Sequence, residues 1–152
     1  MRRTLTMLCT LLMLAAAGGG AAHGQNGPRT PSPPGARVYF VNVKDGATIP
    51  PNATIRFGVE GMKVVPASVN EPNTGHHHLI IDSDTPPLDT ELPSDRKHLH
   101  FGSGQTETEI DLPPGKHTLQ LVFGDMNHIP HDPPVVSERI TVTVRQGAAA
   151  LH

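Results

Sequence analysis

Hydrophobic and polar residues alternate along several short stretches of this 152-residue chain. In the segment KHTLQLVFG, for example, Leu119, Leu121 and Phe123 occupy alternate positions, and the polar residue Gln120 lies between the first two of them. A period of two is typical of β-strands that bury one face. By this reasoning the pattern predicts six strands, at residues 37–43, 54–59, 76–82, 106–112, 117–124 and 137–144.

Sixteen prolines and fifteen glycines separate these stretches, and hydrophobic residues rarely recur with the period of a helix. Short strands divided by turn residues are typical of all-β domains. We therefore expect an antiparallel, immunoglobulin-like β-sandwich of about seven short strands.

The two ends of the chain differ from its middle. Residues 1–24 combine an early Arg2-Arg3 pair with an apolar run and small residues, which predicts a secretory signal peptide. Residues 25–36 are rich in proline and glycine and are expected to be a linker, and residues 146–152 are expected to be a flexible tail. The folded domain is thus predicted at residues 37–145, in a periplasmic or secreted protein without a membrane span after cleavage.

The charge balance limits the kinds of molecule that the protein could bind, and the cysteine content limits its covalent chemistry. Without Arg2 and Arg3 the chain has ten basic and fourteen acidic residues, and no run of like charge. This balance argues against nucleic acid as a partner. Cys9, the only cysteine, lies in the predicted signal peptide, so the mature chain would have neither thiol nor disulfide.

Histidine is the residue type that suggests chemistry. Eight of the ten histidines lie between His76 and His131, and the pattern His-x-His occurs twice. Alternate residues of a strand share a face, so each such pair can direct two imidazoles at one ion. The predicted metal ligands are His76, His78, His98 and His100, joined from a loop by His128, His131 and Met126, with His117, Asp82 and Asp125 ranked lower.

The types of ligand atom also limit which metal ion the site could bind. Imidazole suits copper and zinc, and a mature chain without cysteine offers only histidine, methionine and carboxylate ligands. Met126 would favour Cu(I), whereas Asp82 or Asp125 would favour Zn(II) or Cu(II). Copper is the favoured cofactor, with zinc as the alternative. His77 falls on the opposite strand face, with Leu79, and is expected to be a partly buried ring bonded to the backbone.

The chain also resembles an uncharacterised bacterial family of secreted proteins, known as a domain of unknown function. The resemblance covers about residues 38–144 and rests on the motifs GHHHLI and HLHFGSGQTE, followed by LPPGKHTLQL. It implies an exported immunoglobulin-like domain and supplies no established activity.

Three classes of function remain open at this point. The first is a metal carrier, buffer or chaperone, which could pass its ion to another periplasmic protein. The second is a metal-dependent enzyme, dismutase-like or hydrolase-like, with Glu107, Asp82 or Asp125 moving protons. The third is a structural or protein-interaction domain without metal, in which clustered histidines could also sense pH.

Overall fold

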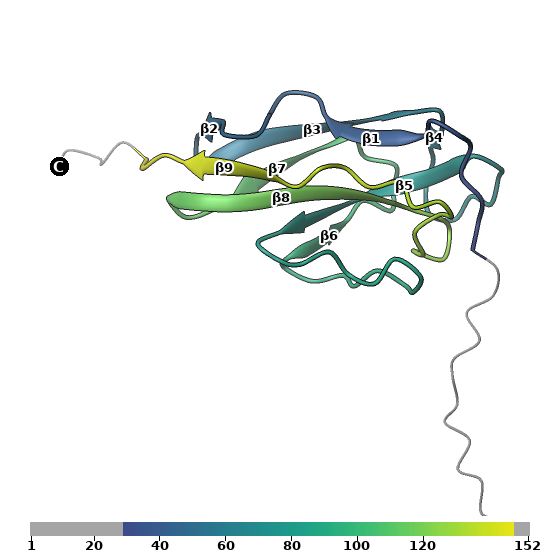
Figure 1. Ribbon diagram of the computed structural model, residues 1–152. Coiled ribbons are helices and arrows are strands. Elements are labelled where there is room, and N and C mark those ends of the chain that lie inside the picture. The colour runs from purple at the N-terminus through teal and green to yellow at the C-terminus, as the bar shows by residue number, and fades with distance from the viewer. Residues whose placement is uncertain (1–28, 148–152) are drawn as a thin grey trace, which may run out of the picture.

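The computed structural model describes residues 29–147, which form nine strands and no helix (Figure 1). The predicted signal peptide lies outside the described residues, as do the first part of the predicted linker and most of the predicted tail. Within residues 29–147 there is no apolar helix long enough to cross a membrane. The strands are β1 (Arg37–Phe40), β2 (Thr48–Ile49), β3 (Asn52–Glu60), β4 (Lys63–Val64), β5 (Thr74–Ile81), β6 (His98–His100), β7 (Glu107–Asp111), β8 (Gly115–Gly124) and β9 (Ile140–Val144).

The strands form two layers (Figure 1). One sheet has the order β1-β3-β7, and the other has the order β2-β9-β8-β5-β4, with β6 also paired to β5. All pairs are antiparallel except the two-residue contacts of β2 with β9 and of β4 with β5. One hydrophobic core, which includes Phe57, Leu79, Leu121 and Phe123, lies between the sheets. The prediction of an all-β sandwich is confirmed.

Strand β5 is buried along its whole length. Its inward residues, such as Leu79 and Ile81, belong to the main core. On its outer face Ile80 packs with Leu92 and Val122 in a second, smaller cluster. Because Leu92 comes from the long connection between β5 and β6, this connection covers the outer face that a two-layer sandwich would leave open to water. A polar side chain on that face is therefore buried too.

The predicted and observed strand bounds differ most clearly at the last strand, where a side chain takes the place of a backbone carbonyl. The last strand was expected to begin at Ser137, but β9 begins at Ile140. The Ser137 hydroxyl accepts a hydrogen bond from the amide of Leu121, in the place of a backbone carbonyl. The two-residue strands β2 and β4 were not predicted, because two residues are too few to show alternation.

Part of the segment expected to be a linker is docked on the domain. Pro31 forms a parallel bridge with Asp132, and the amide of Ser32 donates to the carbonyl of Asp132. Residues 30–32 therefore pair with the folded domain, although the hydrophobic pattern places its start at Arg37.

Candidate metal centre

Two neighbouring strands and one loop bring four histidines together at one end of the large sheet. His76 and His78 lie on the outer face of β5, two residues apart. Strand β6 pairs with β5 so that His100 is directly opposite His78. His128 comes from the loop that follows β8, whose last residue, Gly124, is opposite His76.

The four imidazole rings are mutual neighbours. Ring centroids are 4.9 Å apart for His76 and His78, 5.0 Å for His76 and His100, and 5.1 Å for His76 and His128. The remaining three distances, 5.1, 6.0 and 4.6 Å, complete a compact four-cornered cluster. We call these four residues the histidine cluster. Within it, one ring nitrogen from each of His76, His100 and His128 lies within 4.8 Å of the other two.

Several nitrogens of the histidine cluster have no hydrogen-bond partner. His76 and His78 are 1% and 2% exposed. Their Nε2 atoms lie 3.0 Å apart, which allows one proton between two rings. The Nδ1 atoms of both rings and Nε2 of His100 are buried without a partner among the described residues. A buried polar atom without a partner is costly, so an ion bound by those of these nitrogens that carry a lone pair would reduce this cost.

Burial also keeps these rings neutral. Burial, together with the neighbouring rings of His100 and His128 and against an opposing effect of Asp125, lowers the pKa of His76 to about 4. Burial, followed by the other rings of the cluster, lowers the pKa of His78 to about 2. The pKa of His100 is lowered for the same reasons. Neutral imidazole is the form that binds metal ions, so the rings of His76, His78 and His100 are ready to act as ligands at neutral pH.

Two glycines make room for the rings. A Cβ atom at position 102 would lie 2.5 Å from Nε2 of His100, and closer still to its Cε1. A Cβ atom at position 124 would lie 3.0 Å from Nε2 of His78. Any side chain at residue 102 would therefore displace the His100 ring, and the glycines of the FGSG and VFGD segments are part of the site.

The loop that carries His128 is ordered by Asp125. One carboxylate oxygen of Asp125 accepts hydrogen bonds from the amides of Asn127 (2.8 Å) and Ile129 (3.0 Å). His128 itself has a positive φ of 61°, a conformation that non-glycine residues adopt only with support from their surroundings. Asp125 thus shapes the turn, and Met126, on the same turn, is 36% exposed.

The other predicted ligands lie away from the histidine cluster and have partners of their own. His98 faces Asp95, with Nδ1 2.9 Å from its carboxylate. His131 is fully buried, and both of its nitrogens face carbonyl oxygens, those of Phe123 and Thr74. The structure therefore brings together four of the six higher-ranked histidines and gives the other two separate hydrogen-bonding roles.

His117 and Asp82 form a separate pair at the far end of the sheet. His117 Nδ1 lies 2.6 Å from the Asp82 carboxylate, and Nε2 lies 2.7 Å from the carbonyl oxygen of Pro113. Burial opposes the charge of this ring, but the hydrogen bonds and the charge of Asp82 prevail and raise the pKa of His117. An imidazole that donates from both nitrogens has no lone pair left for a metal.

His77 differs most from its expected environment. The ring is on the face predicted for it, but it is fully buried between Phe57 and Phe123, with centroids 5.1 and 5.2 Å away. Neither ring nitrogen has a partner among the described residues, so the expected backbone hydrogen bond is not formed. The alternation of the sequence identified the strand face on which His77 lies, but it gave no information on which side chains pack against the ring.

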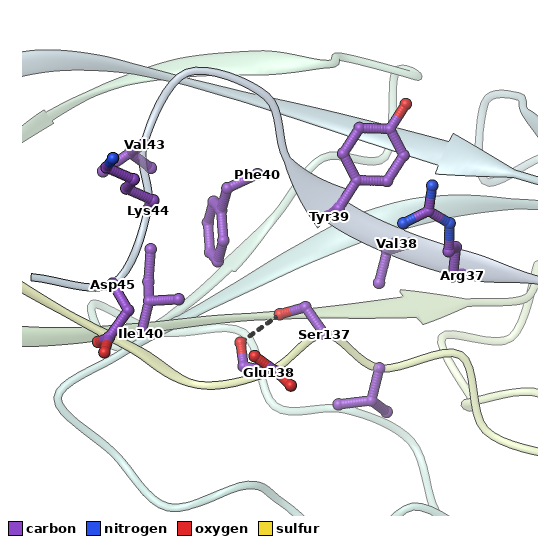
Figure 2. Close-up of a pocket in the computed structure, with 11 residues that line it drawn as sticks. Arg37, Val38, Tyr39, Phe40, Val43, Lys44, Asp45, Ser137, Glu138 and Ile140 are labelled. Atoms are coloured by element: carbon purple, nitrogen blue, oxygen red, sulfur yellow. Dashed lines mark hydrogen bonds between the residues drawn. The ribbon is translucent and has the colours of Figure 1, made fainter. Parts of the chain in front are cut away.

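The described residues also contain a cavity of about 460 Å³ outside the histidine cluster (Figure 2). It lies between β1 and the segment before β9, with Phe40, Ile140 and Tyr39 among its lining residues. Two of its charged groups have partners within the domain: Arg37 pairs with Glu60, and Asp45 accepts a hydrogen bond from the amide of Thr141. Among the described residues, no buried side-chain nitrogen or oxygen without a partner lines this cavity, in contrast to the histidine cluster.

Comparison with models of known protein families matches residues 55–145 to a family described as "Domain of unknown function (DUF4399)". The matched range contains all four residues of the histidine cluster and begins after β1. No curated protein and no solved structure matches the chain significantly.

Proposed function

Because the chain belongs to this family of unknown function, we propose a function from the site itself: the protein binds one transition-metal ion through the histidine cluster. The observation that carries this proposal is the set of four rings within 4.6 to 6.0 Å of one another, with unpartnered nitrogens among them. A hydrogen-bonded structural cluster would satisfy these atoms instead.

We propose copper as the natural ion, with zinc as the alternative. Four imidazoles suit both metals, and a given nitrogen site generally binds copper more tightly than zinc. This order of affinity concerns Cu(II), and a tetrahedral arrangement of the same nitrogens would also suit Cu(I) and Zn(II). Within residues 29–147, cysteine contributes nothing to this site.

A carrier, buffer or chaperone is the role that fits this site best. His76 and His78 are held on a rigid, buried strand, whereas His100 and His128 are only partly covered. An ion could therefore enter and leave on the side of His100 and His128. Residues 1–24, which lie outside the described residues, support export to the periplasm or beyond as part of this proposal.

One observation favours metal-dependent catalysis as a second candidate. His76, His100 and His128 form the tightest group, while His78 instead lies 3.0 Å from the Nε2 of His76. Three histidine ligands with an open position are typical of catalytic zinc sites. If His78 stays outside the coordination sphere, a bound water could occupy that position and be activated.

The proposal is tested by metal titration of two matched variants on β6. His100→Ala removes a ring of the histidine cluster, and His98→Ala removes a ring of the same strand that binds Asp95. We expect His100→Ala to weaken Zn(II) and Cu(I) binding by about tenfold or more. His98→Ala should bind like the wild type, and equal affinity in all three proteins would overturn the proposal.

A further inference from the structure

The segment Arg29–Ser32 is tied to the loop that carries His128. The amide of Asp132 donates to the carbonyl of Thr30 (2.9 Å), and the amide of Ser32 donates back to the carbonyl of Asp132 (3.0 Å). The side chain of Arg29 donates to the carbonyl oxygens of Pro130 (3.1 Å) and His131. We call Arg29–Ser32 the N-terminal strap. It holds the far end of the loop by backbone and side-chain contacts together.

One contact of the strap reaches the residue that shapes the turn. The Thr30 hydroxyl donates to Oδ2 of Asp125 at 2.6 Å. Asp125 is 5% exposed, and its other oxygen accepts the amides on either side of His128. Thr30 therefore fixes the carboxylate, and the carboxylate fixes the backbone from which the His128 ring projects.

His128 is the member of the histidine cluster that most needs such support. The other three rings project from strands, whose backbone positions are set by ladder hydrogen bonds. His128 projects from a turn, in the left-handed backbone region, and its side chain is 31% exposed. Its ring nevertheless lies 4.6 Å from that of His100, so the turn must be held closely in place.

We propose that the N-terminal strap positions His128 for metal binding, with Thr30 and Asp125 as positioning residues. The strap lies outside the residues matched by the family model, so this chain builds part of its site with residues that precede the family domain. The predicted consequence for metal affinity rests on the proposed function, whereas the position of the ring does not.

The test compares two hydroxyl residues of the same strap in the full, purified chain. Thr30→Val removes the hydrogen bond to Asp125 and keeps the shape of the side chain. Ser32→Ala is the matched control, because the Ser32 hydroxyl donates to the carbonyl of Pro133 and not to Asp125. Thr30→Ser restores a hydroxyl and should restore the wild-type behaviour.

The first readout is the set of nuclear Overhauser effects between the His128 and His100 rings in the metal-free protein. We expect Thr30→Val to weaken or abolish them, and Ser32→Ala and Thr30→Ser to keep them. The second readout is Zn(II) affinity. Thr30→Val should lower it about tenfold, as is typical for partners that orient a ligand, and should have no further effect in a His128→Ala background.

The two readouts separate the two claims. If Thr30→Val disturbs the ring contacts while the wild type binds no metal, the strap has its positioning role and the proposed function fails. If Thr30→Val keeps the ring contacts of the wild type, or if Ser32→Ala disturbs them as much as Thr30→Val does, the inference is overturned.

Discussion

Two groups of buried histidines in this protein have opposite hydrogen-bonding states. In the histidine cluster, Nε2 of His76 faces Nε2 of His78, three further ring nitrogens are buried without a partner among the described residues, and only His128 has an oxygen near a ring nitrogen, that of Glu91 at 4.0 Å. At His117 and His131, both ring nitrogens face oxygen acceptors. His76 and His78 in the first group and His117 and His131 in the second are all buried, so burial alone does not separate the two groups.

The difference shows how a ligand histidine can be distinguished from a structural one in the absence of an ion. A ring whose two nitrogens both lie against oxygen atoms has its polar groups satisfied by the protein, and it stabilises the fold by fixing a turn or strand end. A neutral ring with a free lone pair stabilises nothing by itself, and it is costly unless something binds it. Three rings of the histidine cluster, those of His76, His78 and His100, have a buried nitrogen without a partner, and the ring of His128 lies against them.

Among the variants that test this comparison, Gly102→Ala is expected to have the largest effect, which is on metal affinity. The new Cβ would collide with the His100 ring, which can swing away without disturbing the core. We expect metal affinity to fall by about tenfold to a hundredfold, as when a ligand loses its orientation, with little change in melting temperature. Ser103→Ala, in the same exposed turn, is the control. Titration calorimetry measures the metal affinity of both variants. Unchanged affinity in Gly102→Ala would show that His100 is not a ligand.

The next largest effect is expected on the free energy of unfolding, at His117, whose two ring nitrogens both have partners. His117→Leu removes two hydrogen bonds, one of them to a charged partner, and should lower the free energy of unfolding by about 2 kcal/mol near pH 6. Because Asp82 raises the pKa of His117, the charged pair is fully present below the ordinary histidine pKa of 6.5 and is lost as pH rises through the raised value. The destabilisation should therefore shrink at higher pH.

Urea denaturation of wild type and His117→Leu at several pH values checks this prediction. Asp82 must remain ionised, and its own pKa is lowered below 3.8 by the same pair, so the comparison is made above that pH. Metal affinity should be the same in both proteins. A variant that loses metal binding without losing stability would contradict the division into two groups.

The smallest effect is expected at His77, which belongs to neither group. His77→Leu removes two unpartnered nitrogens from the core and should stabilise the protein by about 1 kcal/mol. Burial lowers the pKa of His77 to about 4, so the wild type should lose stability as pH falls from 6.5 towards 4, and the variant should lose less. Thermal denaturation at pH 7 and pH 5 measures both effects. A destabilised variant would mean that the nitrogens of His77 have a functional partner.

The sequence predicts the parts of this site that depend on local periodicity. Alternation places His76 and His78 on one face and His77 on the other, and it makes His98 and His100 a pair. It cannot choose between His98 and His100, because that choice depends on which residue of β6 lies opposite His78. The nearby Asp95 then binds His98.

The loop ligands depend on contacts that are still more distant in the sequence. His128 and His131 lie three residues apart on one loop and have similar surroundings in the sequence. Asp125 and Thr30 turn the first towards the histidine cluster, while the carbonyl oxygen of Thr74 holds the second. Thr30 is 95 residues away from Asp125, so no local pattern could reveal this contact.

The most direct test of the whole account is a Zn(II) titration monitored by NMR, in which the ring signals of the individual histidines are observed. Zinc is diamagnetic, so each imidazole reports its own environment. We predict that the signals of His76, His78, His100 and His128 move together and reach saturation at one equivalent, while those of His98, His117 and His131 stay in place. Shifts spread over all the histidines, or none at one equivalent, would contradict the central claim that the unpartnered rings form a metal site.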